Sequence, residues 1–493
     1  MRKAFLICIA SGLLVTDLVP LARAEGQRDA ADASAQVVLS PTRYDLNVEV
    51  DYAAEAMRAT ARIEVENPSA RPVRTASLLL YRLLRVQAVR DEHGRDLAFG
   101  QTVVTFEDFR KYQANQILVT LAAPLAPRAR TTIQIRYEGP VLGYAETGMR
   151  YIQDRIDPEF TILRDDSLPF PQPGYPSVAS QRGVLSWSFT YSARITVPNG
   201  LVVANGGRLD GIDPVGDKVA YRYSSLKPSW RMDFAIAKYK EVTASGVRVF
   251  HLPGDEAGAA SVVQAATKAV TLFTGWYGPR RGSSVLTFIE IPDGWGSQTD
   301  VTAVIQAAAA FRDPTRLREV YHEISHLWNA PSTESPKPRW EEGLASFLEY
   351  LVTQEITGEP AVERLETQFI DRLRRAIPKT PGLQTVPLVN YGGARMTNWS
   401  YTVGGLFFDL LYRVAGKDTF HAIIGRYSSE FAVRGGSTKD LVDVISRTAT
   451  QDLSSLVNDW LYTTAWTARI EQHPSVENLV QYYRQTIAPS GGR

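Results

Sequence analysis

The residues of this sequence best suited to chemistry are two histidines four positions apart, His322 and His326. Glu323 directly follows the first of them. Residues four apart on an α-helix lie on one face, about one turn from each other, so both imidazoles can bind one metal ion. Zn²⁺ accepts such nitrogen ligands, and Glu323 would then act on a nearby water as a general base. The spacing therefore predicts one Zn²⁺ per chain and a hydrolytic reaction.

A zinc ion in a catalytic site needs a third protein ligand, and two adjacent carboxylates follow the histidine pair. Glu341 and Glu342 stand in the segment WEEGLASFLEY, residues 340–350, at the start of a second predicted helix. A helix N-terminus favours negative charge whatever its function. The residues alone therefore leave the third ligand open between these two glutamates.

The elements that must position these side chains can be predicted from caps and periodicity. Asp313 followed by Pro314 is typical of a helix start, which predicts a helix through Asn329. Prolines at 331, 336 and 338 prevent its continuation, so the second helix is expected over 339–352. Strands are expected over 285–291 and 301–307, and further helices over 257–278, 361–376, 401–415, 417–427, 438–447 and 452–468.

The first half of the chain has a different pattern, with short alternating segments separated by Pro, Gly and Asn. The strands expected there cover 44–50, 61–65, 117–121, 132–137 and 192–197. The segment 168–176 has four prolines in nine residues and is expected to be an ordered loop, because proline cannot continue a regular ladder. We therefore expect an α+β protein with an antiparallel β domain over 36–248 and a mainly helical domain over 249–487.

Composition and charge exclude several classes of protein. Of the 493 residues, 44% are hydrophobic and 22% charged, which is ordinary for a globular chain. The formal net charge of +1 gives no basic field that would indicate a nucleic-acid partner. No stretch after residue 24 approaches 18 uncharged apolar residues, so we expect no membrane span in the mature chain.

Residues 1–24 have the pattern of a secretory signal peptide. Arg2 and Lys3 precede an apolar run over 4–15, and Ala22-Arg23-Ala24 is a cleavage site of the small-x-small type. Cleavage would remove Cys8, the single cysteine, and a chain without thiols suits an oxidising compartment. We expect export to the periplasm or the extracellular space, with an uncleaved membrane anchor as the alternative.

The histidine pair followed by Glu342-Gly343-Leu344-Ala345 resembles the gluzincin zinc metallopeptidases of the aminopeptidase N and leukotriene hydrolase family. The resemblance implies that Glu342, rather than Glu341, is the third zinc ligand. It also implies a thermolysin-like catalytic domain after a saddle-like β domain. Too few residues follow position 415 to form the family's large C-terminal helical domain, so a short form is expected. The fifteen residues between His326 and Glu342 are fewer than the family usually has.

Two further segments extend this resemblance. The segment 398–410 is similar to a helix start with a Tyr-x-x-Gly pattern, which implies that Tyr401 stabilises an oxyanion at the substrate carbonyl. Family aminopeptidases bind the substrate's amino group with the glutamate of a Gly-x-Met-Glu-Asn segment, and the corresponding residues 296–300 read GSQTD. Gly296, Gln298 and Asp300 are therefore the candidate substrate-binding residues, and no glutamate is among them.

These observations lead to one main hypothesis and three alternatives. The main hypothesis is an exported, aminopeptidase-like zinc peptidase that acts on peptide or protein substrates. An endo-acting or relaxed-specificity peptidase remains open because the amine-binding glutamate is replaced. A catalytically silent peptide-binding or scaffold protein of the same fold and a hydrolase of non-peptide substrates are the other two. The intact set of Glu323, Glu342 and Tyr401 argues against a silent protein.

Overall fold

The computed structural model of this chain describes residues 37–147, 152–178, 180–181, 188–280, 285–300 and 302–486. Within them, Val37 and the residues after it form one compact unit. The predicted signal peptide over 1–24 and Cys8 lie outside the described residues. No helix in the described ranges combines the length and the apolar character that a membrane span requires.

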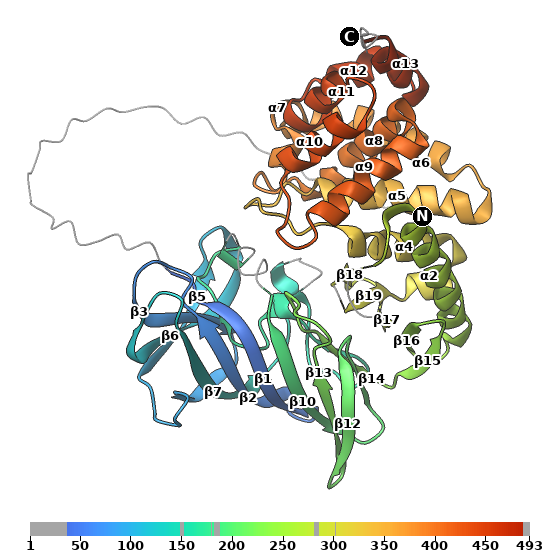
Figure 1. The fold of residues 1–493 in the computed structure, drawn as a ribbon. Coiled ribbons are helices and arrows are strands. Elements are labelled where there is room, and N and C mark those ends of the chain that lie inside the picture. Colours follow the sequence, from blue (N-terminus) through green and yellow to red (C-terminus); the bar gives the residue numbers. More distant parts are fainter. Residues whose placement is uncertain are drawn as a thin grey trace, which may run out of the picture. The chain divides into compact units, whose positions relative to one another are not determined.

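The first half of the chain is a β domain, drawn in blue and green in Figure 1. Its strands are β1 (Ser40–Asp51), β2 (Ala56–Glu66), β3 (Val73–Tyr81), β4 (Arg85–Arg90), β5 (Phe99–Phe106), β6 (Phe109–Leu125), β7 (Arg130–Pro140), β8 (Thr161–Leu163), β9 (Gln172–Pro173), β10 (Thr190–Pro198), β11 (Val202–Ala204), β12 (Arg208–Val215), β13 (Lys218–Ser224) and β14 (Phe234–Ala237). The five strands predicted from alternation lie within β1, β2, β6, β7 and β10 and are confirmed.

These strands form three sheets. The largest has the order β12-β13-β10-β1-β2-β7-β4, and its pairs are antiparallel except for β1 with β10. The second has the order β5-β6-β3-β9 and the third β11-β14-β8. Alternate residues of β1 such as Leu46 and Val48 are buried, because successive side chains of a strand point to opposite faces. The alternation read in the sequence is thus the core face of the sheet.

The proline-rich segment over 168–176 is ordered, as expected, and it contains one element that the sequence did not indicate. Its strand β9 pairs with β3 through two residues, Leu78 with Pro173 and Leu79 with Gln172. The hydroxyl of Ser77 donates a hydrogen bond of 2.7 Å to the carbonyl of Gly174. Proline is tolerated here because β9 lies at the edge of its sheet.

The second half begins with a mixed sheet of order β15-β16-β17-β19-β18. Its strands are β15 (Lys240–Ala244), β16 (Val247–His251), β17 (Leu286–Ile291), β18 (Gln298–Thr299) and β19 (Ala303–Ala307). The domain boundary predicted at 248 therefore falls inside β16, and the change of sheet lies between Ala237 and Lys240. The predicted boundary lies too late in the chain because β15 and β16 alternate like the strands before them. Only the pairing of β16 with β17, and of β15 with β16, shows that both belong to the second sheet.

Both faces of this mixed sheet are covered. Phe288 and Val304 belong to the core that contains helix α2 (Glu256–Tyr277), which lies beside β15 and β16 in Figure 1. The residues that follow them, Ile289 and Ile305, pack instead with strands β8, β11 and β14 of the β domain. A sheet with parallel central strands is normally buried on both sides. Here one side is covered by the β domain, so the two halves share a core.

The rest of the chain is helical. Its helices are α3 (Ala309–Arg312), α4 (Arg318–Ser325), α5 (Trp340–Thr357), α6 (Ala361–Ala376), α7 (Gly382–Thr385), α8 (Thr397–Ala415), α9 (Lys417–Glu430), α10 (Thr438–Thr448), α11 (Ser454–Val457), α12 (Trp466–Gln472) and α13 (Val476–Thr486). The predicted helices over 257–278, 339–352, 361–376, 401–415, 417–427 and 438–447 are confirmed. Together with the β domain they give the α+β architecture that the sequence predicts.

Two predicted helices are interrupted. The helix expected over 313–329 consists of a 3₁₀ turn at 314–316, α4, and a second 3₁₀ turn at 326–328, which is a common way for helix ends to tighten. Asp313 does cap the first turn, since its side chain accepts a hydrogen bond of 2.9 Å from the backbone N–H of Thr315. The helix expected over 452–468 is divided into α11, a π turn at 458–462, and α12.

Helices α5 and α8 cross at two glycines. A Cβ atom on Gly343 would stand 2.4 Å from the Cα atom of Gly404 and 2.8 Å from the backbone nitrogen of Gly405. Backbone atoms cannot move aside as a flexible side chain can, so only glycine permits this approach. Glu342 directly precedes Gly343, and Tyr401 lies one turn before Gly404, so the crossing places both functional side chains.

We expect Gly343→Ala to destabilise the fold, because the added methyl group would force two helix backbones apart. Overpacking of this kind typically lowers the free energy of unfolding by about 1–3 kcal/mol. Gly275→Ala in α2 is the matched control, because a Cβ atom there meets nothing within 4 Å and alanine has the better helix propensity. Urea denaturation of both variants measures the difference, and equal stabilities would contradict the crossing argument.

Candidate functional site

Three potential metal ligands from two helices converge: His322, His326 and Glu342, with ligand atoms within 4.8 Å of one another. The Nε2 atoms of His322 and His326 lie 3.6 Å and 3.5 Å from the same carboxylate oxygen, Oε2 of Glu342. Helix α4 and the turn that follows it supply the histidines, and the first turn of α5 supplies the glutamate. The structure thus brings together the ligand set proposed from the sequence, despite the short connection between the two helices.

Each histidine has a polar side chain against its other ring nitrogen. The Nδ1 atom of His322 lies 3.0 Å from Oε2 of Glu349, and the Nδ1 atom of His326 lies 2.8 Å from the side-chain amide nitrogen of Asn329. Glu349 is itself held by Arg318, whose guanidinium donates to its Oε1. A carboxylate that accepts the Nδ1–H of His322 fixes the orientation of that ring and leaves its Nε2 atom available to a metal. The Nε2 atoms of both histidines are directed at the same oxygen of Glu342.

The carboxylate of Glu342 is held in its charged form. Burial opposes ionisation, but the nearby Arg339 and His326 outweigh burial and keep the pKa of Glu342 well below its ordinary value. For His322, burial disfavours the protonated form and so lowers the pKa. Its hydrogen bonds to Glu342 and Glu349 outweigh burial and raise the pKa of His322 well above the usual value. The site therefore concentrates negative charge around two imidazoles, and a bound cation would replace the proton there.

The residues present fit Zn²⁺. Tetrahedral ligands about 2.0–2.1 Å from zinc are separated from each other by roughly 3.3 Å, and the histidine nitrogens stand 3.6 Å and 3.5 Å from the glutamate oxygen. Two imidazoles and one carboxylate also form one of the ligand sets of catalytic zinc sites, in which the fourth position remains for water or substrate.

Glu323 lies beside this cluster, one residue after His322 on α4, and is half-buried. Its Oε2 atom accepts a hydrogen bond of 2.5 Å from the hydroxyl of Thr299 in strand β18. This contact joins the helix of the two histidines to the edge of the mixed sheet. A glutamate at this position can accept a proton from a water placed between it and the cluster.

Tyr401, in the first turns of α8, lies against the ring of His322. Its ring is nearly parallel to that of His322, with an interplanar angle of 15° and ring centroids 5.8 Å apart. The side chain is half-buried. Helix α8 therefore carries a phenol to the same histidine that Glu349 orients.

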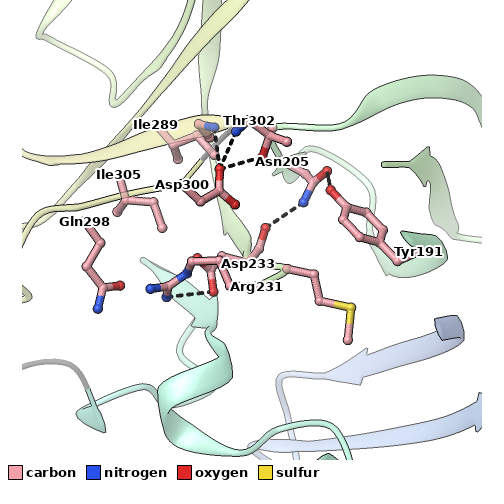
Figure 2. A pocket seen from close by; sticks show the side chains of 12 residues that line it. Tyr191, Asn205, Arg231, Asp233, Ile289, Gln298, Asp300, Thr302 and Ile305 are labelled. Carbon is pink, nitrogen blue, oxygen red and sulfur yellow. Dashed lines mark hydrogen bonds and ion pairs between the residues drawn. The ribbon is translucent and has the colours of Figure 1, made fainter. Parts of the chain in front are cut away.

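Asp300, one of the three candidate substrate-binding residues, is already hydrogen-bonded within the protein through both carboxylate oxygens. Oδ1 of Asp300 accepts hydrogen bonds from the backbone N–H groups of Thr302 and Ala303, at 2.6 Å and 2.7 Å, and from the Thr302 hydroxyl at 2.7 Å. Its Oδ2 accepts one of 3.1 Å from Ser229, and burial raises its pKa. In Figure 2, Asp300 lines a pocket together with Gln298, Arg231 and Asp233.

Gln298 and Gly296 are both held by Arg164 of the β domain. The Nη1 atom of Arg164 lies 3.3 Å from the side-chain oxygen of Gln298 and 3.4 Å from the carbonyl oxygen of Gly296. The amide nitrogen of Gln298 donates to Asp166 at 3.2 Å. Gln298 and Asp300 thus contact the β domain, whereas Thr299 between them contacts Glu323, as the alternation of side chains along a strand requires.

The sequence did not predict several residues of the site. Glu349 could have been found, because it lies two turns after Glu342 on the same helix and so shares its face. Asn329, three positions after His326, could have been found in the same way. Thr299 and Arg164 carried no signal, since their contacts connect segments that are distant in the sequence.

One comparison matches the part of the chain that contains the site. Residues 301–460, which contain the three ligands, Glu323 and Tyr401, match the model of the peptidase family M1 domain. A comparison with curated proteins gives no significant match.

Solved structures give a match along most of the chain. The M1 zinc metallopeptidase of Deinococcus radiodurans is 17% identical with a TM-score of 0.64, and the alignment covers 86% of this chain and 94% of that one. Two structures of variant M1 zinc metallopeptidases, the first from the same organism, have the same identity and coverage. One is bound to a Tyr-Ser-Ala substrate (TM-score 0.63) and the other, described as a two-domain enzyme, to L-tryptophan (TM-score 0.62). The fold is therefore that of two-domain M1 zinc metallopeptidases.

We expect Glu342→Ala to abolish stoichiometric zinc binding, because two imidazoles alone leave the tetrahedral site short of one ligand. Glu341→Ala is the matched control: it removes the adjacent carboxylate of the same helix turn, which is not part of the cluster. Metal analysis of the two purified variants after dialysis decides the matter. Full zinc content in Glu342→Ala would refute the assignment of the third ligand.

Proposed function

We propose that this chain, which carries a peptidase family M1 domain, hydrolyses peptide bonds with a zinc ion held by His322, His326 and Glu342. The observation that carries the proposal is the convergence of these ligands, with Glu323 next to His322 on α4 and the ring of Tyr401 against that of His322. Zinc in such a site polarises a carbonyl group and acidifies water. A catalytically silent scaffold is disfavoured because the chain has both Glu323 and Tyr401, neither of which is needed to hold a metal.

The chain's own residues divide the proton chemistry between them. Glu323 accepts a proton from the attacking water and delivers it to the nitrogen of the leaving amine, so the carboxylate returns to its initial state at the end of the cycle. Tyr401 donates a hydrogen bond from its hydroxyl to the oxygen of the former carbonyl group as negative charge develops there. Glu349 and Asn329 hold the imidazoles in place throughout.

We expect Glu323→Gln to retain the fold and its zinc but to lose most hydrolysis, since an amide of the same size cannot accept the proton. General-base catalysis typically contributes about 10²–10⁴-fold to the rate. Cleavage of a quenched-fluorescence peptide library, with metal analysis on the same samples, tests this. Zinc-loaded Glu323→Gln with activity within threefold of the unaltered protein, about 0.7 kcal/mol, would exclude the role.

Recognition of the substrate's N-terminus separates two versions of this function. A carboxylate that pairs with a buried ammonium group must offer an oxygen to it, yet Asp300 already accepts four hydrogen bonds from Thr302, Ala303 and Ser229. This engagement favours relaxed end recognition. An aminopeptidase-like mode is the second candidate, and the tripeptide bound to the Deinococcus radiodurans relative supports it.

Cleavage of matched peptides with free and N-acetylated ends distinguishes the two versions. With relaxed recognition, we expect acetylation to change kcat/KM by less than tenfold, about 1.4 kcal/mol. With a counter-charge to the amino group, acetylation would cost about 2–5 kcal/mol, the scale for breaking a buried charge pair. Asp300→Asn is the companion variant: if a preference for free ends exists and survives this substitution, Asp300 is not the group that reads the amine.

A further inference from the structure

Strand β18 is only two residues long, yet it reaches both the catalytic cluster and the β domain. It pairs antiparallel with β19 through Gln298 with Ile305 and Thr299 with Val304, and it forms the edge of the mixed sheet. Because side chains alternate along a strand, Thr299 is directed to one side and its neighbours to the other. On its own side, Thr299 meets Glu323 of helix α4.

The hydrogen bond between Thr299 and Glu323 has the properties of a fixed contact. The hydroxyl Oγ1 lies 2.5 Å from Oε2 of the carboxylate, a distance typical of a hydroxyl that donates to a charged acceptor. Threonine is branched at Cβ, which restricts rotation about χ1 and so limits where the hydroxyl can be. A glutamate side chain has more rotatable bonds, and a stiff partner reduces the number of orientations that it samples.

The strand that carries Thr299 is itself anchored by a buried ion pair. Arg164 has no exposed surface, and its Nε atom lies 3.3 Å from Oδ1 of Asp154, which is equally buried. The same guanidinium contacts the carbonyl oxygens of Trp295 and Gly296 just before the strand. After the strand, Asp300 is held by Ser229. The β domain thus fixes the backbone of β18 on both sides of Thr299.

We propose that Thr299 is a positioning residue for the general base: its hydroxyl holds one oxygen of Glu323, so that the other oxygen of that carboxylate is presented to the water in a constant orientation. The inference rests on the proposed function, since it assigns to Thr299 a role in the step that Glu323 performs. Thr299 itself exchanges no proton with the substrate. Its effect is therefore on the rate of the chemical step and not on substrate affinity.

The test compares three substitutions of Thr299 in the full-length, zinc-loaded protein. Thr299→Val keeps the branched shape and removes the hydroxyl, so kcat for a peptide substrate is expected to fall roughly 10- to 100-fold, the scale of one hydrogen bond to a charged group. KM, zinc content and the melting temperature are expected to stay near those of the unaltered protein. Thr299→Ser is expected to recover most of kcat, and Thr299→Ala is expected to resemble Thr299→Val.

Thr243→Val in β15 is the matched control, because it makes the same substitution in another strand of the same sheet and removes a hydroxyl that donates to an exposed glutamate, Glu241, away from the cluster. Its kcat is expected to remain within threefold of the unaltered value. If Thr299→Val does not fold, the ratio of kcat between the serine and alanine variants, which differ only by the hydroxyl, decides the question. A ratio of roughly tenfold or more supports the proposal, and a ratio near one overturns it.

Other outcomes would contradict either the role of Thr299 or the proposed peptidase function on which it rests, and the two cases can be told apart. A loss of zinc or a large fall in melting temperature in Thr299→Val would assign Thr299 a structural role and overturn the proposal. A rise in KM with unchanged kcat would make it a substrate contact, which also overturns it. If the unaltered protein does not cleave peptides, or if Glu323→Gln is fully active, the proposed function itself fails, whatever the Thr299 variants show.

Discussion

The close approach of α5 and α8 at Gly343 and Gly404 is the constraint on which the site depends. A carboxylate and a phenol can face the same pair of imidazoles only if their two helices lie almost in backbone contact, and side chains larger than glycine would prevent it. The crossing brings Glu342 and Tyr401, which are 59 positions apart in the sequence, to the same imidazole, that of His322. The geometry of the zinc ligands in this chain therefore depends on how closely these two helices pack.

Buried charge provides the second level of organisation. Arg318 holds Glu349, which orients His322, and Arg164 pairs with Asp154 while it contacts the segment before β18. A buried ion pair does not by itself stabilise a fold, since desolvation opposes its attraction. Its directional hydrogen bonds do, however, allow few alternative arrangements. In both cases the guanidinium acts on the site through a neighbour, without contacting the metal cluster.

The sequence predicts the parts of this protein that depend on local spacing. The pair His322 and His326 follows from the helical period, and the α+β division follows from the change from alternating to helical patterns. The predicted boundary at 248 falls inside β16, because β15 and β16 resemble the earlier strands and only the parallel pairing of β16 with β17 identifies their sheet. Thr299 with Glu323, and Arg164 with Gly296, could not be predicted, because no periodicity links residues on separate elements.

Strand β18 explains how two domains with separate patterns form one site. A strand has two faces, and in β18 one face is given to Glu323 and the other to the β domain. A shift of the β domain against the strand would displace Thr299, because Arg164 holds Gly296 before the strand and Ser229 holds Asp300 after it. The β domain is thus tied through β18 to the side chain of Glu323, although among the described residues the metal cluster comes from α4, α5 and the turn after α4. This coupling gives a physical reason why a short catalytic unit of this kind retains a large β domain.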